Sequence, residues 1–297
     1  MTIQSDKIPF LLPDSDPTQP VVALHCSGAD GRQWRALSEA LEPPLQLIAP
    51  AFYGAAGHRG WSGDRPFSLA EEARPILELI DAMAIPFHMV GHSYGGGVAL
   101  HIALQRPQAV SSLTLYEPSA FHLLRLVGAA EAETFAEIKA VANATARGLA
   151  TGDYRGAAEA FVDYWSGSGA WATLRPSLRS GLTQWLPKAP LDFHALIEET
   201  TPLEAYQALE FPVSILRGSL APAPTAAVAR LLSGALPNCE TKSFANAGHM
   251  GPISHAELVN RHIVSFLKAN QKPKAPFRQP TFSGTGLSTL SDQEPKT

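Results

Sequence analysis

The chain has 297 residues, of which 45% are hydrophobic and 17% charged, and its formal net charge is -4. This composition is typical of a globular protein that buries a substantial core, and the small acidic excess gives no reason to expect nucleic acid or an anionic membrane surface as a partner. No apolar run approaches the ~18 residues that span a bilayer, and the first residues lack the basic and apolar stretches of a secretory signal.

Only two cysteines, Cys26 and Cys239, occur in the chain, and they lie far apart without metal-ligand spacing. We therefore expect two free thiols in a reducing compartment, the cytoplasm, and no metal site. The sequence also has no dinucleotide-binding glycine pattern and no phosphate-binding loop, so no cofactor is expected.

Apolar runs alternate with helical patterns in the first part of the chain. Residues 31–41 carry apolar side chains at helical spacing. Ser68 is expected to cap a second helix that runs to Ala84, with Glu71 three residues on completing a capping box. Runs typical of buried strands are found at residues 21–25, 45–49, 87–90 and 113–116. Strands that alternate with helices in this way predict an α/β fold with a parallel sheet.

The alternation stops at Pro118. From there to about Tyr206 the sequence has helical patterns without a credible strand, and it is rich in large side chains such as Trp165. We interpret residues 118–206 as a helical insertion into the sheet domain.

The sheet is predicted to resume after the insertion, at residues 212–217 and 239–244, before a last helix from His255 to Ala269. The end of the chain is rich in Pro, Ser, Thr, Gly and Lys and has little to bury, which indicates a flexible tail. The predicted units are a core of residues 1–117 and 207–270, an insertion of residues 118–206, and a tail of residues 271–297.

The most informative motif is Gly91-His92-Ser93-Tyr94-Gly95, which fits the Gly-x-Ser-x-Gly pattern between a buried strand and a glycine-rich helix. A strand that turns this sharply into a helix strains its turn residue, and the flanking glycines remove Cβ atoms that would clash. The turn lifts the Ser93 hydroxyl clear of the sheet, which predicts a nucleophile. The alternative is a glycine-rich connection that only packs tightly.

A serine hydroxyl needs a base to remove its proton. Of the 10 histidines, His249 is the best candidate, because it lies in a glycine-flanked loop between the last strand and the last helix. The alternative is a loop histidine that only packs. His25 and His92 neighbour the predicted site and are expected to shape it by hydrogen bonding and to line the substrate pocket.

On these marks the chain resembles the α/β-hydrolase fold, and in particular the capped esterase-like and haloperoxidase-like serine hydrolases. The resemblance covers roughly residues 21–269 and rests on residues 24–28 (LHCSG), 91–95 (GHSYG) and 248–250 (GHM). It implies a mostly parallel sheet flanked by helices and the chain order nucleophile, acid, histidine. It also implies that the insertion is a cap that covers the site and shapes the acyl pocket.

The acid departs from the usual pattern of this family. Most members carry Asp in a turn after the strand that follows the cap, but Ala221 occupies that position here, and no Asp or Glu occurs from residue 211 through 238. Some members, the haloalkane dehalogenases among them, carry the acid after the strand that precedes the cap, where this chain has Glu117. We therefore predict a Ser93–Glu117–His249 triad. The alternative is that Glu117 pairs with an arginine of the cap.

The oxyanion hole is expected to use two backbone amides, those of Tyr94 and Ser27. The family commonly has glycine where Cys26 stands, and we interpret this thiol as filling space beside the site; the alternative is a second nucleophile. Trp165 of the cap, with Cys26, is expected to contact the substrate.

These residues favour a serine hydrolase that cleaves a carboxylic ester or a related acyl compound, of the carboxylesterase class. Hydrolysis of a carbon–carbon bond in a diketone, of a lactone or of a thioester uses the same triad and stays open. A ligand-binding receptor or pseudoenzyme on this fold is a further alternative, supported by the empty acid position at Ala221. The apolar cap suggests a small-molecule substrate with a hydrophobic group, and the sequence does not indicate an oligomeric state.

Overall fold

The computed structural model describes residues 19–55, 57–63 and 65–271. The expectation about a signal at the N-terminus lies outside this range, and so does the predicted tail of residues 271–297 except for its first residue.

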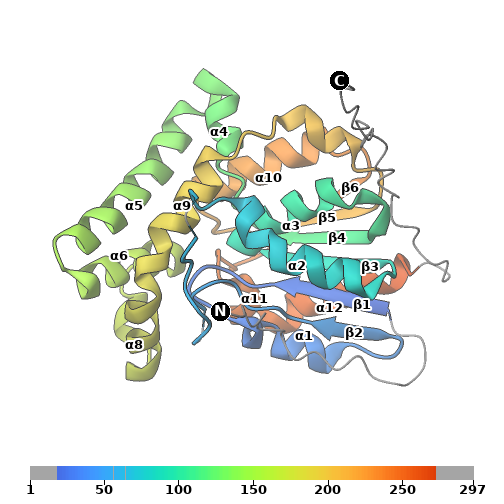
Figure 1. Cartoon of the computed structure of the whole chain (residues 1–297), viewed down its shortest axis with the longest axis horizontal. Coiled ribbons are helices and arrows are strands. Elements are labelled where there is room, and N and C mark those ends of the chain that lie inside the picture. Colours follow the sequence, from blue (N-terminus) through green and yellow to red (C-terminus); the bar gives the residue numbers. More distant parts are fainter. Residues whose placement is uncertain (1–18, 56, 64, 272–297) are drawn as a thin grey trace, which may run out of the picture.

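A six-stranded sheet forms the centre of the molecule, with the strand order β2-β1-β3-β4-β5-β6 (Figure 1). Every neighbouring pair is parallel, as the alternation of strands and helices predicted. The strands are β1 (Gln19–Leu24), β2 (Leu45–Ile48), β3 (Phe87–His92), β4 (Val110–Tyr116), β5 (Val213–Gly218) and β6 (Cys239–Phe244). All residues of β3 and β4 are buried, because helices cover both faces of a parallel sheet.

Two hydrophobic clusters lie on the two sides of the sheet. One includes Trp34 and side chains of α1 (Arg35–Ala40) and α12 (Ala256–Ala269). The other includes side chains of α2 (Leu69–Met83), α3 (Tyr94–Gln105) and α10 (Ala223–Ala235), and it continues into the insertion. The short helix α11 (Gly251–Ser254) precedes α12.

Helix α2 begins where the sequence predicted. Ser68 is its N-cap, and the Ser68 hydroxyl accepts a hydrogen bond from the amide of Glu71 at 3.3 Å. Such a cap satisfies one of the amides that the first turn of a helix leaves unpaired. The helix ends at Met83, and its C-cap Ala84 has a left-handed conformation (φ 51°).

The segment between β4 and β5, all of which is described, contains helices and no strand. Its α-helices stand to one side of the sheet in Figure 1. They are α4 (His122–Leu126), α5 (Ala132–Ala150), α6 (Tyr154–Ser166), α7 (Ala170–Thr173), α8 (Pro176–Trp185) and α9 (Ala189–Glu198). Phe161, Trp165, Trp185 and Phe193 of this segment are buried in the same cluster as α2 and α3. The insertion therefore packs directly on the core, and its treatment as a separate cap stays a prediction.

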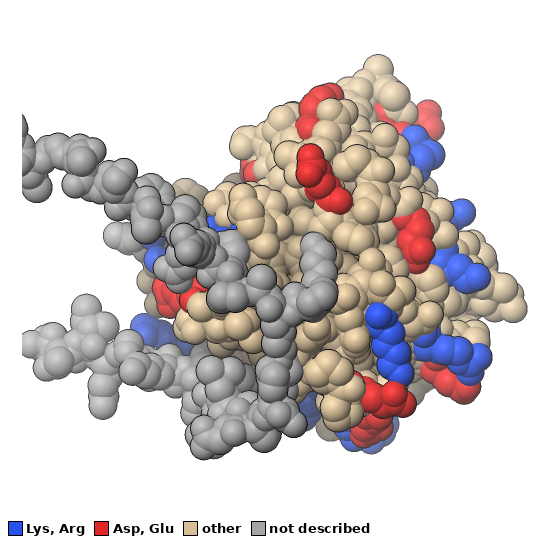
Figure 2. Space-filling model, turned by 90° about the vertical axis from the view of Figure 1, so that its right-hand side faces the viewer, with Lys and Arg blue, Asp and Glu red and all other residues tan. Residues whose placement is uncertain are grey.

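The face opposite these helices shows interspersed acidic and basic side chains (Figure 2). Over the coloured part of that face, neither sign gathers into a large patch.

Candidate active site

Strand register brings Ser93 and Glu117 to the same edge of the sheet. His92 at the end of β3 pairs with Tyr116 at the end of β4, so the next residue of each strand emerges beside the other. The amide of Ser93 donates to the carbonyl of Tyr116 at 3.0 Å, which continues the ladder to the turn. The carboxyl edge of a parallel sheet is where α/β proteins usually bind ligands.

Ser93 has the strained backbone that the motif predicted, with φ 56° and ψ -119°. A Cβ added at Gly95 would overlap the carbonyl oxygens of Leu24 and His25, and one added at Gly91 would lie 2.7 Å from the carbonyl oxygen of Gly95. Glycine at 95 lets the turn approach the end of β1, and glycine at 91 lets the start of α3 approach β3. Together they allow Ser93 a conformation that non-glycine residues seldom adopt.

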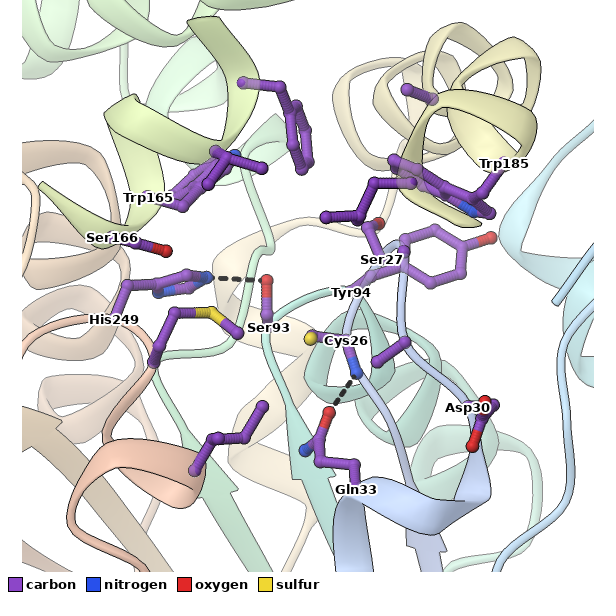
Figure 3. A pocket seen from close by; sticks show the side chains of 18 of the residues that line it. Cys26, Ser27, Asp30, Gln33, Ser93, Tyr94, Trp165, Ser166, Trp185 and His249 are labelled. Atoms are coloured by element: carbon purple, nitrogen blue, oxygen red, sulfur yellow. Dashed lines mark hydrogen bonds between the residues drawn. The ribbon is translucent and has the colours of Figure 1, made fainter. Parts of the chain in front are cut away.

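His249 lies between Ser93 and Glu117, in the loop that joins β6 to α11. Its Nδ1 is 2.7 Å from Oε2 of Glu117. Its Nε2 is 2.8 Å from Oγ of Ser93, the bond drawn between these two side chains in Figure 3. Because an ionised carboxylate only accepts, Nδ1 carries the proton and Nε2 accepts from the Ser93 hydroxyl. All three side chains are buried.

Glu117 is held by two further donors. The amide of Gly218 donates to Oε1 at 2.8 Å, and the hydroxyl of Thr225 donates to Oε2 at 3.0 Å. No arginine of the described residues bonds to this carboxylate. The end of β5 and the first turn of α10 thus support Glu117, while Ala221 in the loop between them supplies no acid.

The side of Ser93 away from His249 is formed by Ser27, Cys26 and Tyr94 (Figure 3). Tyr94 is the first residue of α3, where helical geometry leaves the backbone amide without an intrahelical acceptor. The amide of Cys26 is already used, because it donates to Oε1 of Gln33 at 3.0 Å. An oxyanion hole made by the Ser27 and Tyr94 amides stays a prediction.

Of the four predicted substrate contacts, Cys26 and Trp165 line the cavity at Ser93, whereas His25 and His92 lie behind its wall. Nδ1 of His25 donates to the carbonyl of Cys26 at 2.8 Å, and its Nε2 accepts from the amide of Phe52 at 3.2 Å. Burial lowers the pKa of His25 to about 4, so the ring is neutral at pH 7. Burial also raises the pKa of the Cys26 thiol to about 12, which disfavours the thiolate that a second nucleophile would need.

His92 holds the loop of His249. Its Nε2 donates to the carbonyl of His249 at 2.8 Å, and its Nδ1 accepts from Nε2 of Gln33 at 3.1 Å. Gln33, which the sequence did not single out, thus joins the amide of Cys26 to the carbonyl of His249 through His92. Burial, first of all, keeps the pKa of His92 well below its usual value.

Ser119 is a second residue that the sequence did not identify. Its Oγ is 3.2 Å from Oγ of Ser93, and its amide donates to the Ser93 carbonyl at 3.0 Å. Because the Ser93 hydroxyl donates to His249, the hydroxyl of Ser119 donates to Ser93.

The cavity above Ser93 has a volume of about 830 Å³. The ring of Trp165 lies 4.4 Å from that of His249, centroid to centroid, and covers the base. Further apolar walls come from Phe121, Phe161, Val162, Trp185, Phe193 and Leu196. Three arginines, Arg32, Arg35 and Arg175, also line the cavity, and all three are exposed.

Within the described ranges, no group of His, Cys, Asp and Glu side chains is arranged to hold a metal ion. None of the helices in those ranges is both long and apolar enough to cross a membrane.

Comparison with known proteins identifies relatives of this chain. The model of the alpha/beta hydrolase family matches residues 21–262. The chain is 31% identical over 157 residues to the lipase LipV of Mycobacterium tuberculosis, a match that covers 52% of each protein. It is 38% identical over 103 residues to a putative carbamate hydrolase, RutD, of Klebsiella pneumoniae, covering 33% of this chain and 38% of that protein. The chain thus spans about half or less of the length of these curated relatives.

Solved structures share its fold at low identity. A hydrolase from Pseudomonas aeruginosa superposes with a TM-score of 0.66 at 23% identity, covering 84% of this chain and 90% of that one. An esterase from Exiguobacterium antarcticum superposes with a TM-score of 0.67 at 19% identity, covering 84% of this chain and 92% of that one. A hydrolase from a deep-sea metagenome library superposes with a TM-score of 0.72 at 14% identity, covering 86% of this chain and 91% of that one.

Proposed function

Because the chain belongs to the alpha/beta hydrolase family, whose fold its sequence predicted, we propose that it is a serine hydrolase that cleaves a carboxylic ester or a related acyl compound. The observation that carries the proposal is the position of His249, with Nε2 2.8 Å from the Ser93 hydroxyl and Nδ1 2.7 Å from Glu117. A base that is oriented by an acid and bonded to a hydroxyl is the arrangement that activates serine.

In the proposed acylation step, His249 takes the proton of Ser93 while Oγ attacks the substrate carbonyl carbon. Glu117 holds the imidazole in the required tautomer and stabilises the imidazolium that forms. The amides of Ser27 and Tyr94 stabilise the negative charge on the carbonyl oxygen, and each such donor contributes about 10²–10³ in rate. His249 then gives its proton to the leaving alcohol.

In the deacylation step, His249 removes a proton from water, which attacks the acyl group on Ser93. Ser93 recovers its proton from His249 and leaves, and the acid product is released. This step needs no cofactor. The turn carries a serine where the epoxide and haloalkane hydrolases of this fold carry an aspartate, which argues against those two reactions.

The cavity favours substrates with an apolar acyl or alcohol group. Its volume of about 830 Å³ is ample for a small molecule, and aromatic side chains of the insertion dominate its inner wall. The lipase and carbamate hydrolase among the relatives suggest ester and carbamate substrates for the first trials. Lactones, thioesters and diketones remain candidates because they use the same triad.

A fluorophosphonate probe and a p-nitrophenyl ester test the proposal. We expect the probe to label the intact protein at Ser93, the ester to give a burst of nitrophenol, and Ser93→Ala to abolish both. A protein that binds such esters without labelling or turnover would instead be the receptor that the sequence left open. A panel of short and long esters, carbamates, lactones, thioesters and diketones then ranks the substrate classes by kcat/KM.

A further inference from the structure

A cluster of three buried charged residues adjoins the cavity. Nζ of Lys188 bonds to Oδ1 of Asp192 and, at 2.6 Å, to Oε2 of Glu72. Their exposed fractions are only 7%, 3% and 2%, respectively. Burial raises the pKa of the Asp192 carboxyl to about 6. Burial also disfavours the ammonium of Lys188, but the two carboxylates outweigh it and raise the pKa of that group.

The cluster joins the insertion to the sheet domain. Glu72 belongs to α2 of the core, and its Oε1 also accepts from the amide of Tyr53 at 2.9 Å. Lys188 ends the 3-10 turn Leu186–Lys188 of the insertion, and Asp192 follows in the first turn of α9.

Each end of the cluster is bonded to a residue of the proposed oxyanion hole. The hydroxyl of Ser27 donates to Oδ2 of Asp192 at 2.6 Å, and the hydroxyl of Tyr94 donates to Oε2 of Glu72 at 2.7 Å. The ammonium of Lys188 also lies 4.8 Å from the centroid of the Tyr94 ring. One ammonium therefore connects the two residues whose amides face the oxyanion.

The placement of these charges is costly for stability. Two carboxylates share one ammonium in the interior. A buried ion pair often contributes less to the free energy of unfolding than apolar side chains of the same shape would. Charged hydrogen bonds nevertheless fix geometry, because they are short and leave little freedom to the groups they join. An oxyanion hole needs such geometry, since its donors must already point to the place where charge develops.

We propose that Glu72, Lys188 and Asp192 are positioning residues of the oxyanion hole, which hold Ser27 and Tyr94 in register and make the hole depend on the seating of the insertion. The proposal rests on the serine hydrolase function proposed above. When the helices that carry Lys188 and Asp192 leave the core, the loop of Ser27 loses its anchor, and Tyr94 keeps its bond to Glu72 of α2 but loses the ammonium beside its ring. The oxyanion hole is then complete only when the insertion is seated on the core and closes the cavity.

The anchors can be removed without removing the amides. Ser27→Ala and Tyr94→Phe delete one hydroxyl each, and Asp192→Ala deletes the partner of Ser27. We expect each variant to lower kcat by about 10-fold or more, less than the 10²–10³ lost with a whole donor, and to leave KM within about twofold. The Ki of a trifluoromethyl ketone, whose adduct with Ser93 carries an oxyanion, should rise by the same factor as kcat falls.

Two comparisons separate positioning from general packing. Ser27→Thr keeps the hydroxyl and should restore kcat. The double variant of Ser27→Ala with Asp192→Ala should have a kcat no lower than that of the worse single variant, because both substitutions remove the same bond. Glu131→Gln is the matched control. It breaks another ion pair between insertion and core, that of Glu131 with Arg230, away from the cavity and should leave kcat unchanged.

Lys188→Met tests the centre of the cluster, but it leaves two buried carboxylates facing each other and is expected to lower stability. The neutral triple variant of Glu72→Gln, Lys188→Met and Asp192→Asn avoids that repulsion and should fold, with reduced kcat and a raised Ki for the ketone.

The proposal is overturned if Ser27→Ala, Tyr94→Phe and Asp192→Ala keep kcat within about twofold of the parent protein, or if Glu131→Gln loses as much as they do. In either case ester turnover and probe labelling of the parent protein leave the serine hydrolase function standing. If the parent protein itself shows neither labelling nor turnover, the function fails, and the positioning role fails with it.

Discussion

Ser93 and Glu117 occupy equivalent places at the ends of two paired strands, and both have a positive backbone φ, of 56° and 43°. Each turn aims its side chain over the edge of the sheet, where His249 bonds to both. A glutamate has no intrinsic preference for that backbone region, so the fold must hold it there. The bonds from Gly218 and Thr225 to its carboxylate supply that restraint.

Replacing Glu117 by glutamine tests its place in the triad. The amide has almost the same shape but cannot stabilise the imidazolium of His249, and its NH2 group favours the wrong tautomer. We expect kcat to fall by up to the ~10⁴ known for a comparable change of acid to amide. Steady-state kinetics on a p-nitrophenyl ester measure the loss, and a decrease smaller than tenfold would remove Glu117 from the triad.

Gly251 is predicted to keep the His249 loop in place. A Cβ at Gly251 would overlap the hydroxyl of Tyr116, which donates to the carbonyl of Gly248 at 2.8 Å. Gly251→Ala should therefore shift the loop and lower both kcat and the free energy of unfolding.

The matched control for that change is Gly248→Ala, where the nearest atom to an added Cβ is 3.8 Å away, an ordinary contact. It should be tolerated in urea unfolding and in turnover. Adding Tyr116→Phe to Gly251→Ala removes the overlapping oxygen and should recover part of the loss. Equal effects of the two glycine substitutions would show that Tyr116 is not the reason for glycine at 251.

Local patterns were enough to predict the sheet and the turn at Ser93. Apolar runs mark strands that are buried on both faces, and the order of strands fixes which loops meet at one edge. Glu117 was identified through the resemblance to family members that carry the acid after the strand preceding the cap, and its contact with His249, 132 residues away, follows from the topology.

Contacts between side chains of distant loops were not predictable in the same way. Gln33 was missed, and its bond to His92 joins residues 59 apart in the sequence. The bond between Ser27 of the core and Asp192 of the insertion joins residues 165 apart. The expectation that His25 and His92 line the pocket was wrong, because the sequence does not show to which side of a strand end a side chain turns. Both rings are turned into the wall, where they bind backbone groups.

Gln33 is predicted to stabilise the active site through its two hydrogen bonds. Gln33→Leu leaves the amide of Cys26 and Nδ1 of His92 without their partner, and a buried group left unpaired costs about 1–3 kcal/mol. We expect a lower free energy of unfolding in urea and a reduced kcat.

Gln33→Glu distinguishes the two bonds. Glutamate still accepts from the Cys26 amide, but it cannot donate to His92, whose Nδ1 must then carry the proton. Nε2 of His92 would lose its proton and its bond to the carbonyl of His249. If this variant keeps the full kcat, the tautomer of His92 is not needed to hold the base.

Buried neutral histidines predict that the protein loses stability as the pH falls below about 6.5. Burial lowers the pKa of His122, as it does that of His25, to about 4, so the unfolded chain binds protons that the folded chain excludes between pH 6.5 and 4. Stability therefore rises with pH in this window, by up to about 1.4 kcal/mol per pH unit for each such histidine. Asp192 opposes this below pH 6, because burial raises its pKa to about 6 and its protonation favours the folded state.

His122 allows the effect to be measured away from the triad. It lies in α4, with Nε2 3.4 Å from the hydroxyl of Tyr206. The free energy of unfolding of His122→Gln, measured in urea from pH 4.5 to pH 8, should show a smaller slope than that of the parent protein below pH 6.5. At pH 8, His122 is unprotonated in both the folded and the unfolded protein. The difference in free energy of unfolding between the two proteins at that pH therefore gives the cost of the substitution itself, and it is subtracted. Parallel curves over the whole range would mean that His122 takes up its proton in the folded protein as readily as in the unfolded chain, which its burial in this structure does not allow.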